Sequence, residues 1–306
     1  MNISRFTLGT AQLGLDYGIA NINGKPDIVK ALEILNAAVG CGVTSFDTSY
    51  SYGESEEILG SFIAKRAGKG EGLSIISKLP KILLGVSPAP QIVYKEVKKY
   101  VTESIKRLNV DTISVYLMHD ASDICSYEGN VLKSLTKIRE EGLIGTVGAS
   151  FYYPDDAERV LDVDDIGAVQ VPVNLMDHRF IRNGLMSRLS RKGKIVFARS
   201  VFLQGLFFMD HEELSEKMCH VKPYLRKAVS LAGEHNLGMD ELAMGFVNSI
   251  PGISSFVIGA DNATQVLRNS ELIDNPPMDS QLYGKISGHF AYVPEKVTIP
   301  IFWGKE

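Results

Sequence analysis

Short apolar runs alternate with longer amphipathic segments along this 306-residue chain, and this alternation constrains the fold more than any single motif does. Each short run has the length and apolar content of a buried strand. Strands that alternate with helix-length segments are typical of β-α-β units, in which helices cover a parallel sheet. The predicted strands are residues 5–9, 44–47, 73–78, 113–119, 143–150, 168–171, 195–200 and 255–258.

The segments between these strands carry apolar residues at helical spacing. Eight strands fit a closed barrel better than an open sheet of five or six strands, and no linker or shift in composition divides the chain. The sequence therefore predicts an α/β fold, a single (β/α)8 TIM barrel that forms one domain over residues 1–306. Clear helical patterns cover residues 27–40, 54–66, 91–108, 128–140, 155–161 and 263–272.

Three stretches depart from this regular alternation. Residues 174–193 and 207–236 add helices and loops around the seventh strand, and the tail after Asp274 is rich in aromatic residues and proline. In βα barrels such additions gather at the C-terminal ends of the strands, where active sites lie. We therefore expect the tail over this rim, either as a substrate lid or as a surface wrap that seals the barrel edge.

Composition narrows the classes of partner. The chain is 22% charged with a net charge of −4, and no block of Lys and Arg suggests a nucleic-acid or membrane-surface partner. The N-terminus lacks the pattern of a secretory signal, and no apolar run approaches the ~20 residues that span a bilayer. Three cysteines without paired spacing suit a reducing compartment. We expect a cytoplasmic monomer or small homo-oligomer that acts on a small molecule.

Four polar side chains stand at the ends of consecutive predicted strands or in the loops that follow them. They are Asp47, Tyr52, Lys78 and His119. Strand ends of a parallel barrel point to one rim, so these four should converge despite their separation in sequence. Each alone has a structural explanation, since a strand-end Asp often caps a helix and a single His is more often a packed residue. Four at successive strand ends indicate a site.

The chemistry that these residues suggest is proton delivery to a carbonyl. Tyrosine, with a pKa of about 10, is a weak acid at neutral pH. A neighbouring Lys78 ammonium is expected to lower that pKa, and Asp47 to keep Lys78 charged and oriented. His119 would donate a hydrogen bond to the carbonyl oxygen. None of the four donates a hydride, so a reduction needs a cofactor.

No H-E-x-x-H motif or Cys/His cluster suggests a metal site.

The stretch FDTSYSYGESEEILG, residues 46–60, resembles the signature of the aldo-keto reductase family. Further matches follow in order at residues 8–10, 76–78, 118–120 and 144–150, and the resemblance runs from about Phe6 to Asp274. It implies reduction of an aldehyde, ketone or sugar carbonyl to an alcohol, or the reverse, with Tyr52 as the proton donor.

The resemblance also implies an extended NADPH or, alternatively, NADH across the rim, in keeping with the absence of a G-x-G-x-x-G turn. Ser150 and Gln170 would bind the carboxamide of the nicotinamide. The loop after Arg199 would bind the pyrophosphate of the cofactor, and residues 259–269 would bind its adenosine. The implied cofactor residues are Ser150, Gln170, Arg199, Ser200, Phe202, Gln204, Gly205, Gly259, Gln265, Arg268 and Asn269.

Two departures from the family pattern bear on the ligand. Arg199 replaces an aromatic residue that stacks on the nicotinamide, so it could stack there, or reach a phosphate or an anionic substrate group. Gln265 replaces a ligand of the 2′-phosphate, for which Arg268 could substitute, and this weakens the expected preference for NADPH. A weaker similarity to reductases of polysaccharide and nucleotide-sugar pathways suggests a sugar-like substrate whose anionic group lies near Arg199 or Arg179.

Two other functions remain open from the sequence. Lys78 at a strand end could form a Schiff base, as in class I aldolases and lyases. The second alternative is a redox sensor, a barrel that binds the nicotinamide cofactor without catalysing a reaction.

Overall fold

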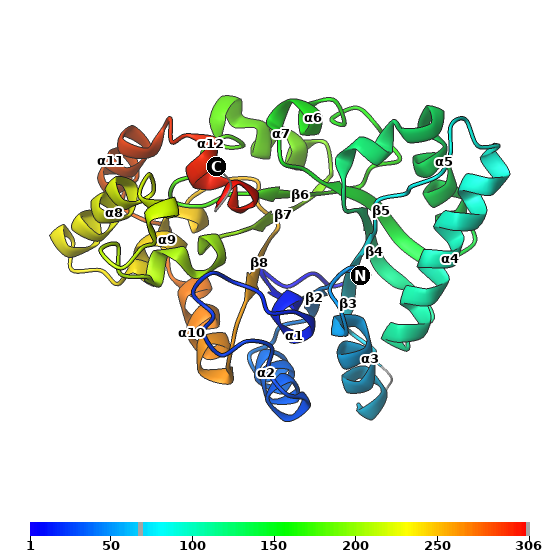
Figure 1. Cartoon of the computed structure of the whole chain (residues 1–306), viewed down its shortest axis with the longest axis horizontal. Coiled ribbons are helices and arrows are strands. Elements are labelled where there is room, and N and C mark those ends of the chain that lie inside the picture. The colour runs from blue at the N-terminus through cyan, green and yellow to red at the C-terminus, as the bar shows by residue number, and fades with distance from the viewer. Residues whose placement is uncertain (67–69, 304–306) are drawn as a thin grey trace.

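Eight parallel strands close into a barrel in chain order, with helices around the outside (Figure 1). The structure is a computed structural model, and it describes residues 1–66 and 70–303. The closed ring confirms the predicted (β/α)8 TIM barrel, and each predicted strand is present. The strands are β1 (Phe6–Gly9), β2 (Ser45–Asp47), β3 (Ser74–Leu79), β4 (Ile113–Met118), β5 (Ile144–Ser150), β6 (Ala168–Pro172), β7 (Ile195–Arg199) and β8 (Ser255–Gly259).

Helices follow the strands and cover the outer face of the barrel. None of those in the described part of the chain is long and apolar enough to span a bilayer. The α-helices are α1 (Ala11–Gly14), α2 (Ile28–Gly40), α3 (Ser55–Lys65), α4 (Pro90–Leu108), α5 (Ser126–Glu140), α6 (Pro154–Glu158), α7 (Leu185–Arg191), α8 (Lys222–Glu234), α9 (Met239–Asn248), α10 (Ala263–Asp274), α11 (Ser280–Phe290) and α12 (Glu295–Thr298). Short 3₁₀ helices are η1 (Ala121–Ile124), η2 (Arg182–Gly184), η3 (Leu203–Phe208), η4 (Glu216–Met218) and η5 (Pro300–Phe302).

The strand register brings the polar strand ends to one level. Gly9 of β1 pairs with Asp47 of β2 and with Gly259 of β8, which closes the ring. Ser150 of β5 likewise pairs with Gln170 of β6. Below this rim a small apolar cluster fills the barrel interior, and a much larger one lies between strands and helices. The polar residues therefore stand on a packed base, as in other barrels of this kind.

Four α-helices of the described residues, α1, α9, α11 and α12, are not predicted by the sequence patterns above, and α9 and α11 are the longer two. In α11 the buried residues Leu282, Ile286 and Phe290 recur every four positions, but two glycines among them weaken the helical signal. The side chain of Asp279 accepts hydrogen bonds from two N–H groups at the start of this helix and so compensates. In α9 the chain enters the helix at Gly238 rather than at an Asp, Asn, Ser or Thr cap, so the usual signal for a helix start is absent.

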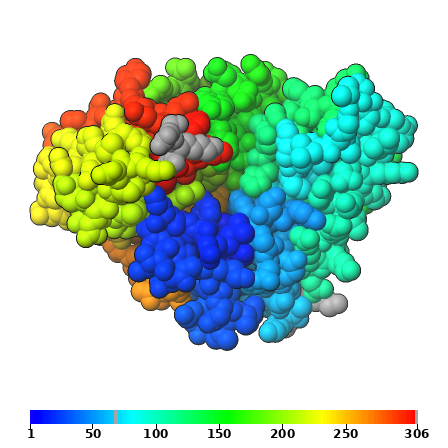
Figure 2. Space-filling model, in the orientation of Figure 1, coloured from blue at the N-terminus to red at the C-terminus, as the bar shows by residue number. Residues whose placement is uncertain are grey.

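The C-terminal tail lies over the rim, between the α8 region and the segment that joins β6 to α7 (Figures 1 and 2). Arg182 donates a hydrogen bond to the carbonyl of Ala291, and the carbonyl of Lys296 lies 3.0 Å from Nε2 of His220. Val297 and Thr298 are buried. These attachments favour a wrap over a movable lid for the described part of the tail.

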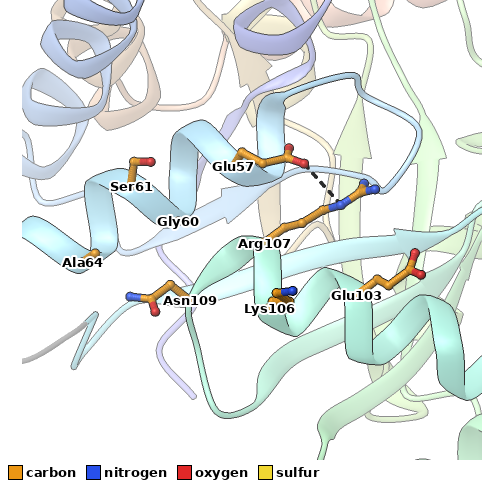
Figure 3. Close-up of a pocket in the computed structure, with 8 residues that line it drawn as sticks. All are labelled: Glu57, Gly60, Ser61, Ala64, Glu103, Lys106, Arg107 and Asn109. Carbon is orange, nitrogen blue, oxygen red and sulfur yellow. Dashed lines mark ion pairs between the residues drawn. The ribbon is translucent and has the colours of Figure 1, made fainter.

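A groove runs between α3 and α4 on the outer wall of the barrel, with a volume of about 520 Å³ (Figure 3). An ion pair between Glu57 and Arg107 crosses it. At its floor the helices are in direct contact, because a Cβ added to Gly60 would overlap the carbonyl oxygen of Arg107. This groove lies apart from the strand ends and lacks the four residues singled out above.

The contact at Gly60 makes a matched pair of substitutions informative. We expect Gly60→Ala to lower the free energy of unfolding by about 1–3 kcal/mol, because the backbone of α4 must shift. Gly40→Ala, at the end of α2, meets no atom within 4 Å and should leave stability equal or slightly higher. Urea denaturation followed by circular dichroism measures both, and equal effects would contradict the proposed close packing.

Candidate active site

A buried ion pair forms the centre of the rim. Nζ of Lys78 lies 2.6 Å from Oδ1 of Asp47 and 2.7 Å from the carbonyl oxygen of Thr48. The other carboxylate oxygen of Asp47 accepts a hydrogen bond of 2.7 Å from Nε2 of Gln170. Lys78 is 1% exposed, so its charge depends on these partners rather than on water. Burial lowers the pKa of Lys78, and Asp47 opposes this shift.

Tyr52 is held over this ion pair by the loop between β2 and α3. Nζ of Lys78 lies 4.8 Å from the centre of the Tyr52 ring. Two glycines allow the Tyr52 turn to lie directly on α1. A Cβ added to Gly14 would overlap the carbonyl oxygen of Tyr52, and a Cβ added to Gly53 would overlap the carbonyl oxygen of Gly14. Gly53 also has a positive φ of 55°, which favours glycine. Close backbone packing therefore sets the position of Tyr52.

Tyr52 remains a protonated phenol in this pocket. Burial raises its pKa well above the ordinary value, and the Asp47 carboxylate raises it further, while the positive charge of Arg199 opposes the shift. The expectation that Lys78 lowers the pKa of Tyr52 is therefore wrong for this structure. The physical reason is that burial penalises the charged phenolate, and the nearby Asp47 carboxylate adds to this penalty. A phenol that keeps its proton suits a donor better than a base.

His119 completes the group of four. Its ring stands edge-on to that of Tyr52, with centroids 5.7 Å apart, and its Nδ1 lies 3.3 Å from Oγ of Ser49. Ser49 Oγ also accepts a hydrogen bond from the N–H of Ser51, so its own proton is free for Nδ1. The tautomer with the ring proton on Nε2 satisfies this contact, with Nδ1 as the acceptor. Burial, with the charges of Lys78 and Arg199, lowers the pKa of His119 to about 3, so the ring is neutral.

A cavity of about 520 Å³ opens at this rim and extends toward α10. Asp47 and Tyr52 line it, whereas Lys78 and His119 are not among its lining residues. Ser150, which is 3% exposed, does not line it either. The other ten residues implied by the resemblance all line the cavity: Gln170, Arg199, Ser200, Phe202, Gln204, Gly205, Gly259, Gln265, Arg268 and Asn269.

The loop after β7 has an unusual backbone. Ser200, Leu203, Gln204 and Gly205 all have positive φ angles, between 47° and 86°, and three of them are not glycine. Such conformations cost about 1–3 kcal/mol each and gather at binding sites, where successive N–H groups can form a concave anion site. This loop therefore fits the phosphates of a dinucleotide. Gly259, on the opposite side of the ring closure, packs closely on Gln12, because a Cβ there would overlap the side chain of Gln12.

Charges at the α10 end of the cavity are already paired. Arg268 contacts Asp240 at 2.7 Å and Glu241 at 3.0 Å, and Gln265 accepts a hydrogen bond from the N–H of Asp261. Arg268 is thus not free to take up a 2′-phosphate without giving up acidic partners.

Arg199 and Arg179 have different surroundings. Arg179 pairs with Asp177 at 2.7 Å, lies 3.6 Å from Glu295 and donates to the carbonyl of Tyr152. The suggestion that Arg179 binds a substrate anion is therefore wrong, because its side chain already joins two loops and the tail. Arg199 lines the cavity beside Tyr52.

Several residues at or near the cavity are not predicted by the sequence, among them Gln12, Tyr17 and Tyr152. Gln12 and Tyr17, from the segment after β1, line it, and Tyr152 lies 4.4 Å below the guanidinium of Arg199. All three follow strand ends, so the rule that places active sites on βα loops could have found them. No group of His, Cys, Asp and Glu residues among the described positions could hold a metal ion.

Comparisons with known proteins agree with this geometry. The sequence model of the aldo/keto reductase family matches residues 5–290. An aldo-keto reductase of Strobilurus tenacellus is 26% identical over 65% of this chain, and an NADH-specific methylglyoxal reductase of Escherichia coli is 26% identical over 67%. The matched segments span only 57% and 66% of those relatives. An aldo-keto reductase structure from Bacillus halodurans superposes with a TM-score of 0.75 at 19% identity, over 97% of this chain and 96% of that one, which shows the fold alone.

The lowered pKa of His119 has a measurable consequence. On acidification the unfolded chain takes up this proton near the ordinary value of 6.5, but the folded protein only near about 3. Stability should therefore fall as the pH drops through this window. We expect His119→Gln to make that fall shallower in urea titrations, and the NMR signal of His119 to stay constant from pH 8 to about pH 4.5. A midpoint near pH 6.5 would contradict the neutral ring.

Proposed function

Because this chain belongs to the aldo/keto reductase family, we propose that it reduces the carbonyl of a small aldehyde, ketone or sugar with a nicotinamide cofactor. The observation that carries the proposal is the buried Lys78–Asp47 pair, which lies beneath Tyr52 at the mouth of a cavity. A relative named an NADH-specific methylglyoxal reductase supports the same class of reaction.

In this proposal Tyr52 donates a proton to the carbonyl oxygen. Its raised pKa keeps the phenol protonated at neutral pH, and its release of the proton is aided by the positive charge of Arg199. Neutral His119 directs its Nε2–H at the same oxygen and stabilises the negative charge that develops there. The Lys78–Asp47 ion pair lies beneath the ring of Tyr52 and supports it.

The bound cofactor supplies a hydride to the carbonyl carbon. Gln170 would hold its carboxamide through the side-chain carbonyl oxygen, since the amide nitrogen is engaged by Asp47. The strained loop from Ser200 to Gly205 would hold the phosphates, and Asn269 the adenine end. These assignments rest on the lining of the cavity and on the backbone of that loop.

The two other functions have less support. A Schiff-base lysine must reach its substrate, but Lys78 is buried, bonded to Asp47 and Thr48, and absent from the cavity wall. A redox sensor without turnover would not require the edge-on packing of His119 against Tyr52, the residue that lines the cavity.

Removal of one hydroxyl tests the proton donor. We expect Tyr52→Phe to lower kcat by about 10²–10⁴-fold with methylglyoxal or 4-nitrobenzaldehyde, because the proton would then come from water. Cofactor affinity, measured by fluorescence titration, should change little. Tyr50→Phe is the matched control, since its hydroxyl donates to Glu103 and lies outside the cavity wall. Full turnover by Tyr52→Phe would overturn the proposed role.

The paired charges around Arg268 predict the choice of cofactor. We expect NADH to bind at least as tightly as NADPH, because Asp240 and Glu241 already occupy Arg268 and repel a 2′-phosphate. Asp240→Asn should raise the affinity for NADPH relative to NADH severalfold. Fluorescence titration of wild type and variant measures both. Tenfold tighter binding of NADPH by the wild type would contradict this account.

A further inference from the structure

We propose that Arg199 is a subsite for an anionic group of the substrate, so that the enzyme prefers carbonyl compounds that carry a carboxylate or a phosphate. This inference rests on the proposed function and names the substrate class for the same site. It starts from a difference between the two arginines that line the cavity.

Arg268 and Arg199 differ in their partners. Arg268 has Asp240 and Glu241 within 3.0 Å. Among residues 1–66 and 70–303, no carboxylate lies within 4 Å of the Arg199 guanidinium. Its hydrogen bonds go only to neutral oxygens, at 3.2 Å to Oγ of Ser200 and 3.4 Å to the carbonyl of Phe151. Both bonds are long, and a guanidinium has five N–H donors. Arg199 therefore keeps donors for a ligand.

The charges around Arg199 leave its positive charge uncompensated. Asp47, the carboxylate of the catalytic centre, is already bound by Lys78 and Gln170. His119 is neutral because its pKa is lowered to about 3. Lys78 and Asp47 cancel, so the described residues of the centre carry one excess positive charge, that of Arg199. An anion that enters beside Tyr52 would be attracted by it.

The orientation of Arg199 is also set in advance. Its guanidinium lies 4.4 Å from the centre of the Tyr152 ring, and Tyr152 comes from the loop after β5. Stacking on an aromatic face holds the planar fork in one plane, and such a fork matches a carboxylate or a phosphate with two parallel hydrogen bonds. Less side-chain entropy is then lost when the anion binds.

The anion could in principle come from the cofactor rather than the substrate. The loop of positive φ angles, which fits the cofactor phosphates, begins only after Arg199. Arg199 itself ends β7, and its charge acts on Tyr52, His119 and Lys78. It therefore belongs to the carbonyl end of the cavity, and the experiment includes an arm that measures cofactor binding.

The test compares substrates that differ only in charge. Succinic semialdehyde and its methyl ester, and 4-carboxybenzaldehyde and its methyl ester, are assayed with wild type, Arg199→Met and Arg199→Lys. We expect the wild type to favour each anionic member by about 10–100-fold in kcat/KM, the range of a charge-assisted hydrogen bond. Arg199→Met should abolish the preference through KM, and it should lower kcat equally for both members of each pair, because the charge of Arg199 also acts on Tyr52. Arg199→Lys should keep part of the preference.

A matched control removes an arginine charge elsewhere. Arg159→Met alters a side chain that is 79% exposed and pairs only with Asp156, so the preference for anionic substrates should not change. Fluorescence titration of NADH should give Kd values within about threefold for wild type and Arg199→Met. Equal turnover of both members of each pair by the wild type would overturn the proposal. Equal loss for both members in Arg199→Met, together with weaker NADH binding, would overturn it too and assign Arg199 to the cofactor.

A binding experiment separates failure of the subsite from failure of the proposed function. If no carbonyl compound is reduced, calorimetric titration with succinate and with dimethyl succinate still tests the subsite. The subsite is supported if succinate binds and dimethyl succinate does not, and if succinate binding is lost in Arg199→Met but kept in Arg159→Met. Equal binding of succinate by wild type and Arg199→Met contradicts it.

Discussion

The ion pair between Lys78 and Asp47 is the interaction on which the rest of the site depends. Taking both charges out of water costs several kcal/mol, which is recovered only with good geometry and further hydrogen bonds. The carbonyl of Thr48 and the amide of Gln170 provide those bonds, so strands β2, β3 and β6 are joined at one point. The ring of Tyr52 rests over this pair. Polar atoms buried this deeply tolerate few alternative arrangements, and the rim therefore has one defined shape.

Much of this architecture could be predicted from the sequence, because strands buried on both faces appear as short apolar runs. The convergence of Asp47, Tyr52, Lys78 and His119 followed from their places at strand ends. Properties that depend on exact neighbours could not be predicted. The pKa of Tyr52 depends on how deeply the ring is buried and on the nearby Asp47 carboxylate, and the role of Arg179 depends on the tail residue Glu295, which is remote in sequence. In α11, two glycines weaken the helical signal that its buried residues carry.

The cavity has two ends of different electrostatic character. At the α10 end, Arg268 is surrounded by Asp240 and Glu241, so its charge is locally balanced. At the Tyr52 end, the charge of Asp47 is balanced by Lys78, whereas the charge of Arg199 is not balanced by a carboxylate among the described residues. An arginine lines the cavity at each end, and its partners determine what it can do. A guanidinium that is paired with carboxylates holds parts of the protein together, whereas one without such a partner in a cavity wall is available to a ligand.

The closure of the ring between β1 and β8 bears on how the protein is made. Phe6 pairs with Phe256, so the first strand of the barrel can pair with the eighth only after the chain between them has been made. Pairings over such sequence distances form slowly. The segment after β1 lines the cavity through Gln12, which packs on Gly259 of β8, and α1 supports the Tyr52 turn through Gly14. The cavity is therefore complete only when β1 and β8 have paired, and its formation would be a late step in folding.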